Sequence, residues 1–484
     1  MPLNKKTLAV LGAGISGLSA AYRFRKLCPD ATLRVWDRRE RTGGVLTTLH
    51  RDGYQIEQSA DNFITTVPYL VSLCRELGIA DELISTNPRF RRTYVVRKKN
   101  LYLLPDGFLM LAPSKMYPLA ITPILSPSGK LRAALEYFIP PSQSDDDETM
   151  KSFVTRRLGR EVFERLVEPL VSGVYAADMN QLSLMATLPR FREMERQHGS
   201  LIRAMRYQMK INKQAKSQSQ ESGARYSMFV TLRGGLSRIA DTLAANLPND
   251  AIQLNKYAEK LESFTEESGN LKWRITDQNG FAESYDAVIF ATPSYETARL
   301  LTPTYQRLGG LLAGIEHSGT AIITLAFDAS QVKKRLSGMG FVVPKIENSP
   351  ILAGSFSSMK YEHRAPEGKQ LIRVFAGGAR SPEMADMSDE QLLPLVKKEL
   401  RPLLKIDGEP ELETVAHWQR TMPQYHLGHL ERIREVNEIT AKIPHLALAG
   451  NFLEGVGIPV CSLSGQNAAE QIVEKMRWKS LTST

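Results

Sequence analysis

Residues 8–17, with the sequence LAVLGAGISG, decide the fold of this 484-residue chain. The first four form a short apolar run, which is typical of a buried parallel strand. Three glycines follow at the spacing GxGxxG, and the spacing of apolar residues over 16–27 predicts a helix directly after the loop. Residues 33–37 then predict a second strand. The chain therefore begins with a predicted strand–helix–strand unit.

The acidic residue Asp37 follows Gly17 by 20 residues and ends the second predicted strand. In such a unit the first glycine permits a tight turn, and the second lets the backbone approach a pyrophosphate at the helix N-terminus. A carboxylate in the position of Asp37 accepts hydrogen bonds from ribose hydroxyls. The sequence therefore predicts a dinucleotide site. Its residues here are Gly12, Ala13, Gly14, Ile15, Ser16, Gly17 and Asp37.

The composition is that of an ordinary globular protein, with 42% apolar and 24% charged residues, and the length suggests about three domains. The net charge of +10 suits nucleic acid, an anionic membrane surface or an acidic small molecule, and it equally suits solubility alone. Nucleic acid is disfavoured because the basic residues are spread out and no reader motif accompanies them. Three cysteines, at 28, 74 and 461, predict neither a disulfide framework nor a metal site.

Apolar stretches of the chain are too interrupted to predict a membrane span. The nearest candidate, residues 108–128, is broken by four prolines and by Lys115. Prolines at that density would break a spanning helix. We therefore expect a soluble or peripheral protein of the cytoplasm.

Elements of a nucleotide-binding fold recur later in the chain. Residues 287–291 predict a buried strand, and residues 446–449 predict another, followed by a helix over 464–476. The polar stretch 213–223 predicts a flexible loop. Because the fold's elements stand at the start, middle and end, we expect its domains to be interleaved in sequence.

A second pair of glycines distinguishes between cofactors. Arg41-Thr42-Gly43-Gly44 follows Asp37, and a glycine pair so close suggests another close approach of the backbone to the cofactor. The pattern Asp-x3-Arg-x-Gly-Gly resembles the large FAD family that includes amine oxidases, phytoene desaturases and protoporphyrinogen oxidases. The segment 291–293 after a buried strand resembles the same family. This resemblance implies FAD rather than NAD.

Four further segments narrow the resemblance: PLVSGVYA at 169–176, ERQHGSLI at 195–202, WQRTMPQYHLGH at 418–429 and EGVGIPVC at 454–461. In this order and over nearly the whole chain, they resemble the porphyrinogen oxidases of haem biosynthesis. The resemblance implies an FAD enzyme that aromatises a porphyrinogen by removing six hydrogens in three two-electron steps, with molecular oxygen as acceptor. An amine oxidase or a phytoene desaturase-like enzyme on the same fold is the more distant alternative.

The fold class that this resemblance implies is α/β plus α+β. It combines a Rossmann-like FAD-binding domain, a mixed-sheet substrate domain and a helical domain that contacts membranes in many relatives. Membrane contact and ordinary packing both remain open for 108–128, and a homodimer also remains open. The expected ranges are 1–72, 228–293 and 440–484 for the FAD domain, 73–88, 185–227 and 294–439 for the substrate domain, and 89–184 for the helical domain.

By motif position, the resemblance extends the FAD site beyond the glycine loop. Residues 58–61 are expected to pass near the flavin, where Ser59 replaces a glycine usual in relatives. Asn451 is expected to hold part of the role of an acid, and Cys461 is expected to be a buried thiol beside a noncovalent flavin. The added FAD residues are Arg41, Gly44, Gln58, Ser59, Ala60, Asp61, Ala258, Trp418, Gly457, Ile458 and Pro459.

A flat macrocycle requires apolar walls on its two faces and polar groups at its ends. The resemblance places Leu352 and Phe375 against the ring, Gly173 below it and Asp61 near the reacting bridge carbon. Plain core packing is the alternative for Leu352 and Phe375. No catalytic side chain is expected, because hydride transfer is the chemistry of the flavin.

The carboxylates of a porphyrinogen require basic partners. Four arginines, at 89, 91, 92 and 97, lie in a predicted hairpin over 89–104, although they could equally form a solvated edge. Many protoporphyrinogen enzymes carry arginine where this chain has Thr93. Thr93 and the 457–459 segment look more like the coproporphyrinogen branch, whose substrate has four carboxylates rather than two. We therefore expect coproporphyrinogen III as substrate, with protoporphyrinogen IX as the alternative.

Overall fold

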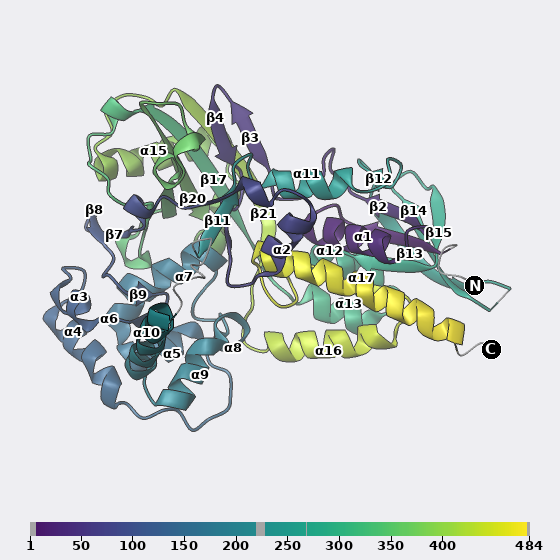
Figure 1. The fold of residues 1–484 in the computed structure, drawn as a ribbon, viewed down its shortest axis with the longest axis horizontal. Coiled ribbons are helices and arrows are strands. Elements are labelled where there is room, and N and C mark those ends of the chain that lie inside the picture. Colours follow the sequence, from purple (N-terminus) through teal and green to yellow (C-terminus); the bar gives the residue numbers. More distant parts are fainter. Residues whose placement is uncertain (1–5, 219–227, 268, 482–484) are drawn as a thin grey trace.

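A computed structural model describes residues 6–218, 228–267 and 269–481 (Figure 1). A five-stranded parallel sheet and a seven-stranded mixed sheet organise these residues. The parallel sheet and its helices lie toward the end that carries both termini, and a group of helices, α3 to α10, lies at the opposite end.

The parallel sheet has β1 at its centre and draws its strands from three distant parts of the chain. This agrees with the interleaving expected from the sequence. The strand order is β12 (Ile252–Gln253), β2 (Thr32–Trp36), β1 (Thr7–Leu11), β16 (Ala287–Phe290) and β22 (Leu446–Leu448).

Alternation along β1 sends its side chains into two cores. Leu8 and Val10 pack with helices on one face, whereas Ala9 and Leu11 pack on the other, as the period of two in a strand requires. The first face carries α1 (Ile15–Leu27), α2 (Tyr69–Glu76), α11 (Ser237–Ala245) and α17 (Ile458–Leu481). The second carries an antiparallel sheet of β13 (Ala258–Thr265), β14 (Leu271–Asp277) and β15 (Ala282–Tyr285), with α12 (Ser294–Leu301), α13 (Gln306–Ala313) and α16 (His429–Lys442).

The seven-stranded sheet buries one face against α15 (Asp389–Leu404), through Leu392, Val396 and Leu400. Its other face meets α7 (Glu168–Tyr175). The strand order is β21 (Leu412–Pro423), β17 (His317–Asp328), β20 (Lys369–Gly377), β19 (Ile351–Phe356), β18 (Gly340–Val342), β7 (Thr93–Arg97) and β8 (Asn100–Leu103).

A fully buried arginine anchors the group of helices. Arg157 forms ion pairs with Glu136 and Glu195, and it also donates to the carbonyl of Gly199 at 3.0 Å. Pairing of this kind is necessary for a charge that has no access to water. The helices are α3 (Met116–Ile121), α4 (Pro127–Ala134), α5 (Met150–Leu158), α6 (Arg160–Val162), α7, α8 (Leu184–Thr187), α9 (Pro189–His198) and α10 (Leu201–Gln218).

Short elements connect these layers. Two hairpins are β3 (Thr48–Arg51) with β4 (Tyr54–Glu57), and β9 (Phe108–Leu109) with β10 (Ala112–Pro113). A three-stranded sheet contains β5 (Phe63–Ile64), β11 (Phe229–Leu232) and β6 (Leu83–Ser85), and α14 (Ser357–Lys360) follows β19.

Packing differs from the expected domain ranges in three places. The hairpin β7–β8 joins the seven-stranded sheet rather than the helices, because β7 pairs in parallel with β18. Helices α9 and α10 pack with α5 rather than with that sheet, and α12, α13 and α16 pack on the parallel sheet. These contacts join segments distant in sequence, so local patterns did not indicate them. The division into three domains stays a prediction.

Two predicted elements have different bounds in the structure. The helix predicted over 464–476 begins earlier, at Ile458. The loop predicted over 213–223 is helical up to Gln218, where α10 ends, and the rest of it lies outside the described residues. Among the described residues, no helix has the length and apolar character needed to cross a membrane.

Candidate active site

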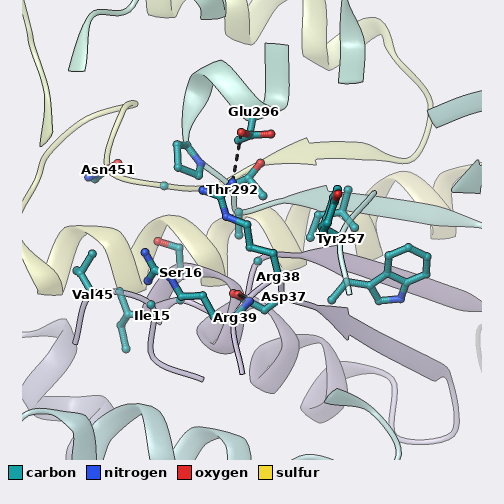
Figure 2. Close-up of a pocket in the computed structure, with 18 of the residues that line it drawn as sticks. Ile15, Ser16, Asp37, Arg38, Arg39, Val45, Tyr257, Thr292, Glu296 and Asn451 are labelled. Carbon is teal, nitrogen blue, oxygen red and sulfur yellow. Dashed lines mark hydrogen bonds and ion pairs between the residues drawn. The ribbon is translucent and has the colours of Figure 1, made fainter. Parts of the chain in front are cut away.

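A cavity of about 620 Å³ opens at the carboxyl end of β1, where the GxGxxG loop begins (Figure 2). Ligands commonly bind at this edge of a parallel sheet. Eight of the residues expected to bind FAD line the cavity: Gly12, Gly14, Ile15, Ser16, Asp37, Gly44, Ala258 and Ile458.

The glycines of the first loop are required by close backbone contacts. Gly12 has a φ of +109°, and a Cβ there would lie 2.6 Å from the carbonyl oxygen of Ala291. A Cβ on Gly17 would lie only 1.8 Å from the oxygen of Gly12. Gly17 therefore shapes the loop by its close contact with Gly12, and Ala13 does so through its backbone N–H, which donates to Asp37. Neither residue lines the cavity.

The second glycine pair lies against the first loop. The Gly43 N–H donates to the Ala13 carbonyl at 2.8 Å, and a Cβ on Gly44 would lie 3.1 Å from the Cα of Gly14. Gly14 precedes α1 and provides no side-chain cap, and the first turn of that helix contains no acidic residue. The free N–H groups at this helix end suit a pyrophosphate.

Asp37 points into the cavity from the end of β2 (Figure 2). Its two carboxylate oxygens accept from the backbone N–H groups of Ala13, at 2.7 Å, and Arg39, at 2.9 Å. A carboxylate has about four acceptor positions. Asp37 is therefore held rigidly and keeps acceptor capacity for ribose hydroxyls.

One end of the cavity is formed around Ala258, at the start of β13. Arg38 reaches across this end to Glu296, 3.5 Å away (Figure 2). Arg299 donates to the Ala258 carbonyl at 2.6 Å. Most lining residues here were not predicted from the sequence; they are Arg38, Arg39, Lys256, Tyr257, Glu259, Glu296 and Arg299.

The opposite end is formed by the start of α17. Because this helix begins at Ile458, its N-terminal end, which favours negative charge, borders the cavity. Asn451 lies here and donates to the Thr421 carbonyl at 3.0 Å. Burial raises the pKa of the Cys461 thiol to about 12, so the thiolate that a covalent bond to flavin would require is disfavoured. Gly457 and Pro459 flank Ile458 without lining the cavity.

Several expected FAD residues lie behind the cavity wall. The Gln58 N–H donates to the Thr47 carbonyl at 2.8 Å, and the Trp418 indole donates to the Gln58 carbonyl at 2.5 Å. The guanidinium of Arg39, which lines the cavity, lies 5.5 Å from the Trp418 ring. Six further residues expected to bind FAD do not line the cavity: Arg41, Gln58, Ser59, Ala60, Asp61 and Trp418.

Asp61 is held between two cations. The Lys360 ammonium lies 2.9 Å and 3.0 Å from its two oxygens, and the Arg373 guanidinium lies 3.4 Å away. Burial would raise the pKa of this carboxyl, but the charges of Lys360 and Arg373 outweigh it and lower the pKa to about 2. Asp61 is therefore ionised at any physiological pH.

The expected substrate residues gather where α7 meets the seven-stranded sheet. A Cβ on Gly173 would lie 3.8 Å from Val342 and 3.9 Å from Ala353, and Ala353 stands opposite Phe375 in the neighbouring strand. The register of β19 shifts at Leu352, which is 3% exposed. Ala353 rather than Leu352 therefore stands beside Phe375, a shift that the sequence did not indicate.

Thr93 lies on the same face of this sheet. It pairs with Gly340 in β18, two positions from the pair of Val95 with Val342. Because alternate residues share a face, Thr93 and Val95 point the same way, and Val95 packs with the helices. The structure thus brings Thr93, Gly173 and Phe375 to one interface.

Residues 15–473 match the family of flavin containing amine oxidoreductases. The coproporphyrinogen III oxidase of Bacillus subtilis is 33% identical over 96% of this chain and 97% of its own length, and that of Staphylococcus aureus is 30% identical over 97% and 100%. This chain belongs to the flavin-containing amine oxidoreductases and, within them, to the porphyrinogen oxidases. It is an FAD-dependent oxidoreductase.

Two further similarities extend the comparison. The chloroplastic protoporphyrinogen oxidase of Nicotiana tabacum is 29% identical over 97% of this chain and 86% of its own length. The crystal structure of a protoporphyrinogen oxidase homologue from Exiguobacterium superposes with a TM-score of 0.84 at 27% identity, covering 98% of this chain and 99% of that one.

The cavity fits the cofactor of this family. It has glycine backbone where a pyrophosphate would lie, a carboxylate placed for a ribose and the N-terminal end of α17 at the far side. We therefore assign the cavity to FAD.

Proposed function

We propose that this enzyme oxidises coproporphyrinogen III to coproporphyrin III by removing six electrons, with FAD as cofactor and molecular oxygen as acceptor. We choose this substrate because the chain is most similar, among the relatives compared above, to the coproporphyrinogen III oxidases. The similarity to them is higher, at 30–33% identity, than the similarity to the tobacco protoporphyrinogen oxidase, and it spans nearly the whole of those relatives.

The interface between α7 and the seven-stranded sheet is the proposed substrate site. Phe375 and Ala353 offer an apolar surface on the sheet, and the exposed Gly173 presents no side chain beside it. Thr93 at the edge of this surface replaces the arginine expected for protoporphyrinogen. Its small side chain leaves space for a substrate with more carboxylates.

The basic hairpin supplies cations at the edge of this interface. Arg91 donates to the Thr86 side chain and carbonyl, at 3.0 and 2.9 Å, and Arg97 donates to the Pro123 carbonyl. These two arginines thus have structural partners within the chain. Arg89 and Arg92, like Arg91, are exposed and lie just before β7. Because the Arg91 side chain is already bonded to Thr86, we assign Arg89 and Arg92 to the propionates.

The chain's own groups position the substrate, because bound FAD accepts the hydride in each two-electron step. Over the three steps the substrate loses four hydrogens from its bridge carbons and two from its pyrrole nitrogens. Each step removes one hydride from a bridge carbon and one proton, which leaves from a nitrogen or from another bridge carbon. Loss of the hydride leaves positive charge on the substrate until the proton departs. Asp61, which the resemblance places near the reacting bridge carbon, is the ionised group that would stabilise this charge.

Porphyrin fluorescence tests this function, because the porphyrinogen does not fluoresce as its porphyrin does. Purified, FAD-loaded protein is expected to turn coproporphyrinogen III fluorescent and to produce about three hydrogen peroxide molecules per porphyrin, as six electrons at two per step require. Diamines and monoamines serve as controls for an amine oxidase. Oxidation of an amine without porphyrin formation would refute the proposal.

We also propose that the enzyme works in the cytoplasm and touches membrane peripherally through α3, α4 and the turn after them. Four side chains there are strongly exposed for apolar groups: Tyr117 at 74%, Ile121 at 61%, Leu131 at 65% and Phe138 at 75%. These helices lie far from both termini (Figure 1). Exposed apolar patches commonly mark interaction sites. Sedimentation with anionic phospholipid vesicles should be lost in Ile121→Glu/Phe138→Glu, and binding equal to wild type would contradict the membrane contact.

A further inference from the structure

We propose that Lys360 and Arg373 are positioning residues that together fix Asp61 as an anion and hold the segment 58–61 behind the wall of the cofactor cavity. This inference rests on the proposed function, and it adds two residues that the motifs did not indicate.

The first contact fixes the segment to the sheet. Arg373 projects from β20 and donates to the Ser59 carbonyl, while its guanidinium faces Asp61. The side chain of Arg373 is 1% exposed, and its planar group lies 5.2 Å from the Phe375 ring. Arg373 therefore links the segment 58–61 to the strand that carries the expected ring-contacting residue.

The second contact fixes the carboxylate itself. Lys360 ends α14 and contacts both oxygens of Asp61, with 15% of the lysine side chain and 14% of the aspartate side chain exposed. Since both oxygens are engaged from one side, the carboxylate has a fixed orientation. The third contact, from Trp418 to Gln58, holds the other end of the segment near the cavity wall.

Charges near Asp61 are not balanced one to one. Arg364 is paired with Glu57 at 2.7 Å, and both side chains are at most 2% exposed. The charge of Arg364 still lowers the pKa of Asp61, and Glu57 also faces Arg373, but Lys360 and Arg373 are the two cations that pair directly with Asp61. The other titratable group against it is the buried Tyr361, whose pKa is raised by burial and which therefore stays neutral. Two cations on one carboxylate keep it ionised despite its burial.

Removing one of the two cations should raise the pKa of Asp61. Without Lys360, burial favours the neutral acid and the pKa of Asp61 rises toward the range of an ordinary or buried carboxyl. The carboxylate would then take up a proton within the working pH range of the enzyme. Its loss as an anion should slow flavin reduction without preventing FAD binding, because Lys360 does not line the cofactor cavity.

The test compares Lys360→Met with Lys360→Arg and with wild type, all loaded with FAD. Rapid mixing with coproporphyrinogen III without oxygen gives the rate of flavin reduction at each pH. We expect a flat profile in wild type between about pH 7 and pH 5, which lies above its carboxyl pKa. In Lys360→Met we expect a rate about 10- to 100-fold lower, as small misplacements of reacting groups produce, falling further as the pH decreases. Lys360→Arg should restore the flat profile.

A second readout needs no substrate. The absorption spectrum of the bound flavin should respond to acid in Lys360→Met and not in wild type or Lys360→Arg, because a nearby carboxylate becomes neutral only in the methionine variant. If wild type fails to oxidise coproporphyrinogen III, the proposed function is wrong while this titration still tests the inference. Lys333→Met is the matched control, since Lys333 pairs with Asp407 at 2.6 Å on the exposed surface.

Two results would overturn the inference. One is a Lys360→Met variant whose rate, pH profile and flavin titration match those of wild type. The other is equal impairment of the methionine and arginine variants, which would indicate a purely structural lysine. An unfolded Lys360→Met variant would shift the comparison to Asp61→Asn, which should lower the rate with no acid response of the flavin spectrum.

Discussion

Gly44 lies directly against Gly14, so that a methyl group on Gly44 would come within 3.1 Å of the Gly14 Cα. This contact brings the two glycine motifs together as one wall of the cofactor cavity. Both residues line that cavity, although 30 residues separate them in sequence.

Gly44→Val should lose FAD. Gly44 has a φ of +62°, where a β-branched residue is strained, and the left-handed conformation costs about 1–2 kcal/mol for L-residues. The added side chain would also press on Gly14. The ratio of flavin to protein absorbance should fall in the purified variant. Gly310→Ala is the matched control, because a Cβ at Gly310 meets nothing within 4 Å. Full flavin occupancy in Gly44→Val would contradict the assigned wall.

Asp37→Ala should weaken FAD binding. The change removes the proposed acceptor for the ribose and also the support for the Ala13 and Arg39 N–H groups. A hydrogen bond to a charged group contributes about 1.5–3 kcal/mol, so the Kd for FAD should rise about 10- to 100-fold. Titration of the apoprotein with FAD, followed by flavin fluorescence, measures this. An unchanged Kd would show that Asp37 does not contact the cofactor.

Acid should destabilise the protein through its buried histidines. Burial lowers the pKa of His317 and His429 to about 4, against 6.5 for the free side chain. Below pH 6.5 the unfolded chain therefore takes up protons that the folded chain refuses, so stability falls as pH decreases toward 4. Each histidine contributes up to about 1.4 kcal/mol per pH unit in this window.

Substitution of one of these histidines tests the origin of the acid sensitivity. His429→Gln removes a titrating group while keeping a polar side chain next to Tyr425. The Tm of this variant should depend less steeply on pH than that of wild type between pH 6.5 and 4. An identical slope would assign the acid sensitivity to other groups.

Local patterns were sufficient for the first strand–helix–strand unit, and that unit places the glycine loop and Asp37. Each of its signals depends on residues close in sequence. Lys256 and Arg299 could not be found this way, because they reach the cavity through the pairing of distant strands and the packing of α12. Arg38 could have been suspected, since it follows Asp37 directly.

The register of the seven-stranded sheet could not be predicted from the sequence either. The bulge at Leu352 decides that Ala353 stands beside Phe375. Asp61 pairs with Lys360 and Arg373, which are about 300 residues away in sequence. They become its neighbours only because β20 and α14 fold over the segment 58–61. No local pattern encodes such a contact.

The most direct test of this account is the kcat/KM of the FAD-loaded enzyme for coproporphyrinogen III and for protoporphyrinogen IX, measured side by side by porphyrin fluorescence. A site that pairs extra carboxylates should favour coproporphyrinogen III by at least about tenfold, which corresponds to about 1.4 kcal/mol. Equal values or a preference for protoporphyrinogen IX would contradict the proposed substrate, and fluorescence from neither would contradict the proposed reaction itself.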